Sequence, residues 1–316
     1  MAWLNVLPIL AVVAAVAPAP EPSATLPIPN DAELIKLQRE ASERITVAVT
    51  IMGQGPFRFM VDTGAQATVV SSALADRLGL TERSAAVLVG MASRSPVETT
   101  PISDFALGTR TFSIRTAPIV EGANIGGADG ILGLDSLQDQ RVLIDFQKQR
   151  IYVADARQLG GNRGFEIVVK ARRRLGQLII TGAMLNGVKT DVVVDTGSQV
   201  SIGTPALLER LRRTKGLGDS TMTDVNGQDL TAPVRIGKKL EIGGMALNGI
   251  PIMFADTAAL RALGLNDKPA LILGVNELKL FRRVAIDFTK QQVLFDLPDD
   301  PRHQDASITA STIRSF

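Results

Sequence analysis

The stretch FMVDTGAQATVVSSALADRLG, residues 59–79, matches VVVDTGSQVSIGTPALLERLR, residues 192–212, at a constant spacing of 133 positions. In each copy an apolar run predicts a strand that ends at an aspartate, Asp62 or Asp195. Thr-Gly follows, then a second apolar run and a segment typical of a short helix. A carboxylate at the end of an apolar strand is costly unless it has partners. The repeat therefore raises the question of which groups the two aspartates contact in the folded chain.

A second pair of matching segments lies farther along each copy. GILGLDSLQDQRVLIDFQKQRIYV, residues 130–153, matches LILGVNELKLFRRVAIDFTKQQVLF, residues 271–295. Gly133 aligns with Gly274 at a spacing of 141 and Asp145 with Asp287 at 142, so the second copy holds an insertion of a few residues. Self-similarity over this length indicates a duplicated domain. It leaves open whether the Asp-Thr-Gly turns carry chemistry or only shape loops in a duplicated β-domain.

These motifs make the chain similar to the retropepsin-like aspartic proteases, in the form that has two such domains fused in one chain. The resemblance rests on VDTGA, VDTGS and the two apolar-apolar-Gly segments, and it covers the chain from about Ile45 to Leu297. It implies an all-β fold with short helices, made of two acid-protease lobes related by a pseudo-two-fold axis. Each lobe would bring one aspartate to that axis.

The resemblance also implies roles for the residues around the aspartates. Asp62 and Asp195 would be the catalytic pair. The residues that support this dyad would be Thr63, Gly64, Ala65, Thr196, Gly197 and Ser198, and the segments behind the two loops would be Ile131, Leu132 and Gly133 with Ile272, Leu273 and Gly274. The threonines would hydrogen-bond across the lobe junction. Glycine has no side chain to keep the loops apart.

Peptide hydrolysis by two carboxyl groups needs one ionised group to take a proton from water and one protonated group to donate to the carbonyl oxygen. Two carboxyls about 3 Å apart cannot both ionise, so a close pair produces this state by itself. Ser198 has a hydroxyl where the first copy has Ala65. We expect this hydroxyl to donate to Asp195, so that Asp195 more often carries the charge and Asp62 the proton.

Two candidate hairpins lie about 28 residues after the aspartates and could close over a substrate. Their tips are VGMASRSPV, residues 89–97, and TDVNGQDL, residues 223–230, in which Asn-Gly is a strong turn signal. Met91 and Val225 are the candidate substrate contacts, although a plain surface hairpin fits either segment equally well. The one tyrosine, Tyr152, lies in neither hairpin, so the flap tyrosine of the pepsin-like branch is missing.

The composition excludes several other chemistries. The chain has no cysteine and one histidine, His303, which excludes a thiol nucleophile, a disulfide and a zinc site of the usual Cys/His kinds. We expect no metal and no cofactor. The formal net charge of +2 gives no argument for a nucleic-acid partner. The expected partner is a polypeptide substrate. The expected state is a monomer, because fusion favours the internal lobe over a lobe of another chain.

The repeats also set the expected domain boundaries. The first lobe would span 45–156, a linker 157–164 and the second lobe 165–298, with a disordered tail over 299–316. Residues 30–44 have the composition of a short polar helix, either a spacer or a pro-segment. Residues 1–29 join an apolar run to a Pro/Ala linker, which resembles a secretory signal or, uncleaved, a membrane anchor. The expected location is therefore periplasmic or extracellular.

The leading hypothesis is an aspartic endopeptidase, a hydrolase that activates a water between Asp62 and Asp195. The alternative is a non-catalytic peptide- or protein-binding protein on the same two-lobed fold, because fold does not determine function. Both aspartates are present with their Thr and Gly neighbours. A protein that only binds peptides would not need both, so the sequence favours the enzyme.

Overall fold

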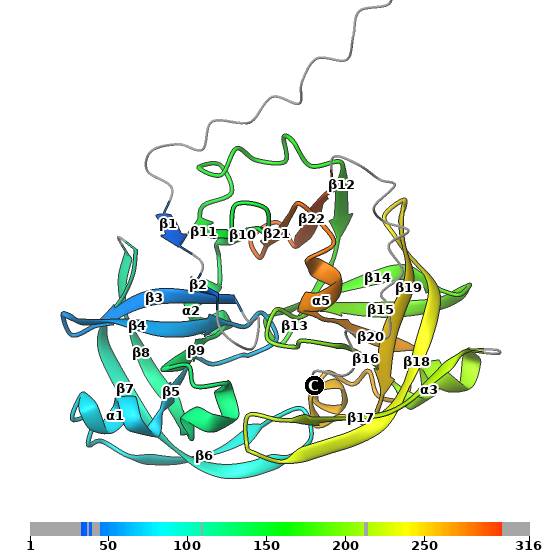
Figure 1. Ribbon diagram of the computed structural model, residues 1–316. Coiled ribbons are helices and arrows are strands. Elements are labelled where there is room, and N and C mark those ends of the chain that lie inside the picture. The colour runs from blue at the N-terminus through cyan, green and yellow to red at the C-terminus, as the bar shows by residue number, and fades with distance from the viewer. Residues whose placement is uncertain (1–32, 37, 40–44, 109, 212–213, 299–316) are drawn as a thin grey trace, which may run out of the picture.

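The computed structural model describes residues 33–36, 38–39, 45–108, 110–211 and 214–298. The chain forms two lobes, each built on an eight-stranded sheet, and the lobes are joined by a six-stranded sheet (Figure 1). The helices are short, with none longer than six residues among the described segments. The expected all-β class with two lobes is confirmed.

The sheet of the first lobe has eight strands in a mixed arrangement. In spatial order they are β2 (Gln38–Arg39), β3 (Ile45–Ile51), β4 (Gln54–Val61), β9 (Gly130–Leu132), β5 (Val69–Ser71), β8 (Arg110–Val120), β7 (Arg94–Leu107) and β6 (Ser84–Val89). The helices of this lobe are α1 (Ser72–Arg77), the 3-10 helix η1 (Gly122–Ile125) and α2 (Leu134–Leu137). Strand β4, which leads to Asp62, runs parallel to β9.

The second lobe repeats this order strand by strand. Its sheet runs β13 (Arg172–Arg174), β14 (Gln177–Leu185), β15 (Val188–Val194), β20 (Ala270–Leu273), β16 (Ser201–Gly203), β19 (Met245–Phe254), β18 (Asp229–Ile242) and β17 (Gly216–Thr223). Its helices are α3 (Pro205–Arg210), α4 (Ala258–Ala262) and α5 (Val275–Leu278). Strand β15, which leads to Asp195, runs parallel to β20. The sequence repeat is thus a repeat of the whole lobe.

The six-stranded sheet belongs to both lobes. Its order is β1 (Glu33–Lys36), β11 (Arg150–Ala154), β10 (Arg141–Asp145), β21 (Arg283–Asp287), β22 (Gln292–Asp296) and β12 (Ile167–Lys170). The central strands β10 and β21 are antiparallel, and their register is symmetric about the pair Leu143 and Ala285. This places the pseudo-two-fold axis between the two strands. The turns that join β11 to β12, within residues 156–164, lead from the first lobe to the second.

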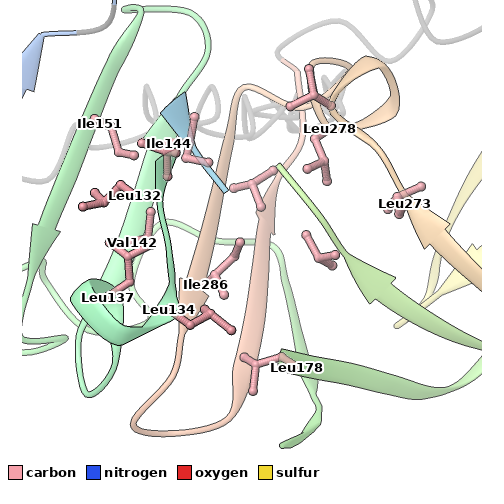
Figure 2. Close-up of a cluster of buried hydrophobic side chains, with 14 of the residues drawn as sticks. Leu132, Leu134, Leu137, Val142, Ile144, Ile151, Leu178, Leu273, Leu278 and Ile286 are labelled. Carbon is pink, nitrogen blue, oxygen red and sulfur yellow. The ribbon is translucent and has the colours of Figure 1, made fainter. Parts of the chain in front are cut away.

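One hydrophobic core runs through both lobes. Figure 2 shows Leu132 and Ile144 of the first lobe in the same cluster as Leu273 and Ile286 of the second. Each of these side chains is at most 3% exposed. Domains that share a large apolar interface do not move independently, so the lobes form one body.

The short polar helix expected over residues 30–44 is wrong where the chain is described. Glu33–Lys36 pairs with β11, and Gln38–Arg39 pairs with β3. Strand β1 closes one edge of the shared sheet as β12 closes the other, so edge pairing overrides local helix preference. The first lobe therefore begins before residue 45. Residues 1–32, 37, 40–44 and 299–316, with the expected signal and tail, lie outside the described residues.

Within the described segments, no helix has the length and hydropathy needed to cross a bilayer.

A buried ion pair ties the shared sheet together. Arg141 donates to the Oδ2 atom of Asp287 from Nε at 3.1 Å and from Nη2 at 2.7 Å, and both side chains are fully buried. Arg141 also donates to the Gly161 carbonyl and, at 2.8 Å, to Asn162 Oδ1. The same guanidinium thus anchors the sheet and the turns that connect the lobes.

We expect Asp287→Ala to lower the free energy of unfolding by about 3–5 kcal/mol, because it leaves the Arg141 charge buried without its carboxylate. Urea unfolding measures the change. Asp145→Ala is the matched control, because Asp145 and Asp287 each accept a backbone bond at 2.7 Å, from Lys148 and Lys290. The control should lower the free energy of unfolding by about 1 kcal/mol. Equal losses in the two variants would contradict a stabilising role for the ion pair.

Candidate active site

The two aspartates sit on equivalent loops that are held from behind by the Ile-Leu-Gly segments. The Asp62 N–H donates to the Leu132 carbonyl at 3.1 Å, and the Asp195 N–H donates to the Leu273 carbonyl at 3.1 Å. These bonds continue the parallel pairing of β4 with β9 and of β15 with β20. Each aspartate is therefore fixed at the point where its strand ends.

The glycines of the Ile-Leu-Gly segments pass too close to the loops for any side chain. A Cβ atom on Gly133 would lie 2.4 Å from the backbone of Ala67, and one on Gly274 would lie 2.6 Å from the Val200 carbonyl oxygen. Beyond them, Leu134 N–H donates to the Ala65 carbonyl at 2.9 Å, and Val275 N–H donates to the Ser198 carbonyl at 2.8 Å. The segments named from the sequence therefore support both loops directly.

The threonines join the loops across the lobe junction. The Thr63 N–H donates to Thr196 Oγ1 and the Thr196 N–H donates to Thr63 Oγ1, each at 3.1 Å. The hydroxyls in turn donate to the strand that precedes the opposite loop, Thr63 to the Val194 carbonyl at 3.0 Å and Thr196 to the Val61 carbonyl at 2.8 Å. Both threonines are 2% exposed. Four hydrogen bonds thus fix the position of one loop relative to the other.

Each loop glycine lies against the carboxyl group of the opposite lobe. A Cβ atom on Gly64 would lie 2.5 Å from the Asp195 carboxyl carbon, and one on Gly197 would lie 2.2 Å from the Asp62 carboxyl carbon. Real Cβ atoms do not approach other atoms so closely. Only glycine at both positions allows the two carboxyl groups to meet.

The two carboxyl groups differ in their surroundings. Asp62 Oδ1 accepts hydrogen bonds from the Gly64 and Ala65 N–H groups, both at 2.8 Å. Asp195 Oδ1 accepts from Gly197 at 2.8 Å and from Ser198 at the longer distance of 3.3 Å. Asp195 is also the more deeply buried of the two, at 6% exposed, whereas Asp62 is half-buried. The ionised form is therefore better supported at Asp62.

The pKa of Asp195 lies well above its ordinary value of 3.8. Burial is the largest cause, followed by the nearby charge of Asp62 and a hydrogen bond with its carboxyl group; the N–H groups of Gly197 and Ser198 oppose the rise. Burial and the neighbouring carboxyl group thus favour the protonated form of Asp195.

The expected role of the Ser198 hydroxyl is wrong. Its Oγ donates to the Val200 carbonyl at 2.8 Å, two residues along its own loop, instead of to Asp195. A serine hydroxyl has one hydrogen to donate, and here a local carbonyl takes it. The hydrogen bond on which the assignment of the charge to Asp195 and the proton to Asp62 rested is therefore not formed, and the raised pKa of Asp195 opposes that assignment.

Three further contacts at the site were not found from the sequence. Thr68 Oγ1 and Ser201 Oγ each accept from the glycine of the Ile-Leu-Gly segment, Gly133 or Gly274, at 3.1 Å. These hydroxyls lie 133 positions apart and align in the repeat, so the sequence comparison could have identified them. The third contact, from Gln177 Nε2 to the Gly64 carbonyl, crosses between lobes and has no such signal.

Behind the second loop lies a buried carboxyl group, Glu277. It is 1% exposed, and one oxygen accepts a hydrogen bond from the Ser201 hydroxyl, while the other, Oε1, has no hydrogen-bond partner among the residues that the structure describes. Burial raises its pKa to about 7, against the bond from Ser201, which lowers it. The first lobe has a neutral serine, Ser136, at the equivalent position, where it lies 2.7 Å from Thr68. The first lobe instead uses the preceding residue, Asp135, which accepts from the Thr68 hydroxyl at 2.6 Å, so both loops have a carboxyl group behind them but at different positions.

The candidate substrate residues lie at the tips of two hairpins, which we call the first hairpin (β6–β7) and the second hairpin (β17–β18). Figure 1 shows the hairpins reaching toward each other from the two lobes. Met91 of the first hairpin packs against an apolar cluster of the second lobe. Val225 of the second hairpin packs against the first-lobe cluster that also carries Ala65, next to the Asp-Thr-Gly loop. Each tip thus crosses to the opposite lobe.

Among the described residues, no group of three His, Cys, Asp or Glu side chains is arranged to hold a metal ion.

The fold and the site together define a two-lobed, pseudo-symmetric β-protein with a carboxyl pair on its axis. A family model for aspartyl protease matches the chain twice, over residues 47–136 and 181–276, which together are more than half of the chain. The chain belongs to this family, and the resemblance seen in the sequence is confirmed. Membership suggests a hydrolase that acts on polypeptides. A comparison with curated proteins found no match.

We expect Asp62→Asn to lower the pKa of Asp195, because the nearby charge is removed, and to leave it above its ordinary value, because burial remains. Ser198→Ala is expected to leave the pKa of Asp195 where it is in the wild type, since the hydroxyl does not reach the carboxyl group. Titration of the aspartate carboxyl carbons by 13C NMR measures both. A shift in Ser198→Ala as large as that in Asp62→Asn would contradict the geometry.

We expect Glu277 to make stability depend on pH. Its pKa is higher in the folded chain, so protonation stabilises the fold fully below about pH 4.5, and this contribution is lost as the pH rises through about 7. In the wild type the free energy of unfolding should fall by on the order of 3 kcal/mol between pH 5 and pH 8, and Glu277→Gln should remove this fall. Urea unfolding measures both. The exposed Glu209→Gln is the matched control. Identical pH dependence in wild type and Glu277→Gln would refute the assignment.

Proposed function

We propose that the protein is an aspartic endopeptidase that hydrolyses peptide bonds with a water held between Asp62 and Asp195. The observation that carries the proposal is the meeting of the two carboxyl groups, each against the glycine of the other lobe. Two carboxyls in this arrangement cannot both be ionised, and the raised pKa of Asp195 supports Asp195 as the group that keeps the proton.

In the proposed reaction Asp62 is the base and Asp195 the acid. Asp62 takes a proton from the water, whose oxygen bonds to the peptide carbonyl carbon, while Asp195 gives its proton to the carbonyl oxygen. In the second step the C–N bond breaks. Asp62 then gives its proton to the leaving nitrogen, and Asp195 recovers a proton from a hydroxyl of the intermediate. Protons balance over the cycle, and each aspartate returns to its starting state.

The threonine and glycine contacts support this reaction by fixing the two groups before substrate arrives. Because the four bonds of Thr63 and Thr196 join the loops, neither carboxyl can move without the other. Preorganised groups lower a barrier more than groups that must be collected during the reaction. The core shared by both lobes supports activity as a single chain, so we propose a monomer.

We also propose a location outside the cytoplasm, periplasmic or extracellular. The support is the apolar run and Pro/Ala linker within residues 1–29, which resemble a secretory signal or an uncleaved membrane anchor.

We expect Asp62→Asn and Asp195→Asn each to abolish proteolysis at every pH and to leave the fold intact, because each removes one member of the pair without changing its shape. Wild-type activity should fall as the pH rises through the raised pKa of Asp195, when the acid loses its proton. Digestion of a denatured protein mixture from pH 3 to pH 9, with circular dichroism of each variant, measures this. Asp76→Asn, on the exposed side of α1, is the control and should cleave as the wild type does.

Wild-type turnover in either active-site variant would refute the dyad. Binding of unfolded protein by the wild type without cleavage at any pH would favour the alternative of a peptide-binding protein on the same fold.

A further inference from the structure

The tips of the two hairpins are joined by one carboxylate, that of Asp224. Its side chain is on the second hairpin and is 3% exposed. Oδ2 accepts three hydrogen bonds from the first hairpin: from Ala92 N–H at 3.1 Å, Ser93 N–H at 3.0 Å and Ser93 Oγ at 2.8 Å. Hydrogen bonds to a buried carboxylate are among the stronger ones in proteins. The contact between the hairpins is therefore specific and polar.

The same carboxylate also shapes its own turn. Oδ1 accepts from the N–H groups of Asn226 at 2.9 Å and Gln228 at 3.0 Å. The Asn226 side chain then donates to Ser93 Oγ at 2.9 Å, so that the serine hydroxyl both donates to Asp224 and accepts from Asn226. Asp224 thus holds the second turn in the shape that receives the first.

The contact is asymmetric although the hairpins are copies of each other. Gly90 and Asp224 are the first turn residues after β6 and β17, and each closes its turn with a backbone bond at 2.9 Å, to the Ser93 and the Gln228 carbonyl. A Cβ atom on Gly90 would lie 2.4 Å from Asp224 Oδ2. The missing side chain of Gly90 therefore leaves the space that the Asp224 carboxylate occupies.

Each tip is also tied to the opposite lobe. The Met91 carbonyl accepts from Ala258 N–H, at the start of α4 in the second lobe, at 3.0 Å. Asn124 of η1 in the first lobe lies with its Nδ2 3.4 Å from the Val225 carbonyl. Val225 and Ala65, three residues after Asp62, pack on the same cluster, so the second tip lies near the loop of Asp62.

We propose that Asp224, with Gly90 and Ser93, is a latch that holds the hairpins closed over the dyad and so controls substrate entry. Opening breaks the three bonds to Oδ2 and lifts Met91 from the second lobe. The gating role rests on the proposed proteolytic function, whereas the latch itself is a property of the folded chain and is tested separately.

The latch is tested by hydrogen exchange of the Ala258 amide, followed by NMR. This amide reports on the docking of the first hairpin but does not touch Asp224. In Asp224→Asn, either orientation of the amide side chain sets its NH2 group against N–H donors, those of the first hairpin or those of its own turn, so the latch is weakened. In Gly90→Ala the new methyl group displaces the carboxylate, with no change of charge and no positive backbone φ to strain. We expect the Ala258 amide to exchange about tenfold faster or more in both variants.

Asp219→Asn is the matched control, because it removes the same charge from an exposed position on β17, the strand that leads to Asp224. It should keep wild-type exchange. The double variant Gly90→Ala with Asp224→Asn should exchange no faster than the faster single variant, since both changes break one contact. Wild-type protection of Ala258 in Gly90→Ala and Asp224→Asn would overturn the latch, even if the wild type proves to cleave nothing.

Gating is tested by the kinetics of the same variants on an unfolded protein substrate. Because opening precedes entry, kcat/KM should rise about threefold or more in Gly90→Ala and Asp224→Asn and stay unchanged in Asp219→Asn. Loss of Ala258 protection together with an unchanged or lower kcat/KM would overturn the gating role and leave the latch as a purely structural contact.

Discussion

The close approach of each loop glycine to the carboxyl group of the other lobe is the constraint on which the rest of the structure depends. Gly64 and Gly197 leave no room for a Cβ atom, and the space they vacate holds Asp195 and Asp62. Two partly buried carboxyls repel when both are charged, so the fold must hold them together. Three features hold them together: the threonine hydrogen bonds across the junction, the Ile-Leu-Gly segments behind the loops, and the core shared by the lobes.

The two lobes are copies of one pattern, and residues that differ at equivalent positions give the two copies different roles. Behind the second loop, Glu277 stands where the first lobe has Ser136. At the hairpin tips, Asp224 stands where the first lobe has Gly90. Behind the loops the first lobe has its own acid, Asp135, one position earlier, whereas at the tips the acid lies on the second hairpin, facing Gly90 of the first. A symmetric pair of Asp224-like residues would place two carboxylates in one buried space, which is unfavourable, so the latch requires that the copies differ.

The sequence repeat predicted the fold and the dyad because both depend on local patterns that occur twice. Apolar strands, Asp-Thr-Gly and Ile-Leu-Gly recur in register, and the same residues support the loops in three dimensions. The strand at Glu33–Lys36 was missed because only the distant edge of β11 stabilises it. The hydroxyl of Ser198 was misassigned because the sequence does not show that the Val200 carbonyl is the nearer acceptor. Asp224 was not singled out from the sequence, since the three donors to its Oδ2 atom lie on another hairpin.

The position of the charge within the dyad follows from burial rather than from the side chains beside it. The Asp-Thr-Gly loops offer both carboxyls the same kind of backbone donors, so these bonds alone would distinguish them little. Asp195 is the deeper group, and desolvation is the largest of the effects that raise its pKa, ahead of the nearby charge of Asp62. Asp62 is the more exposed of the two. A small difference in depth between two copies of one loop therefore gives the two carboxyl groups different preferences for the proton.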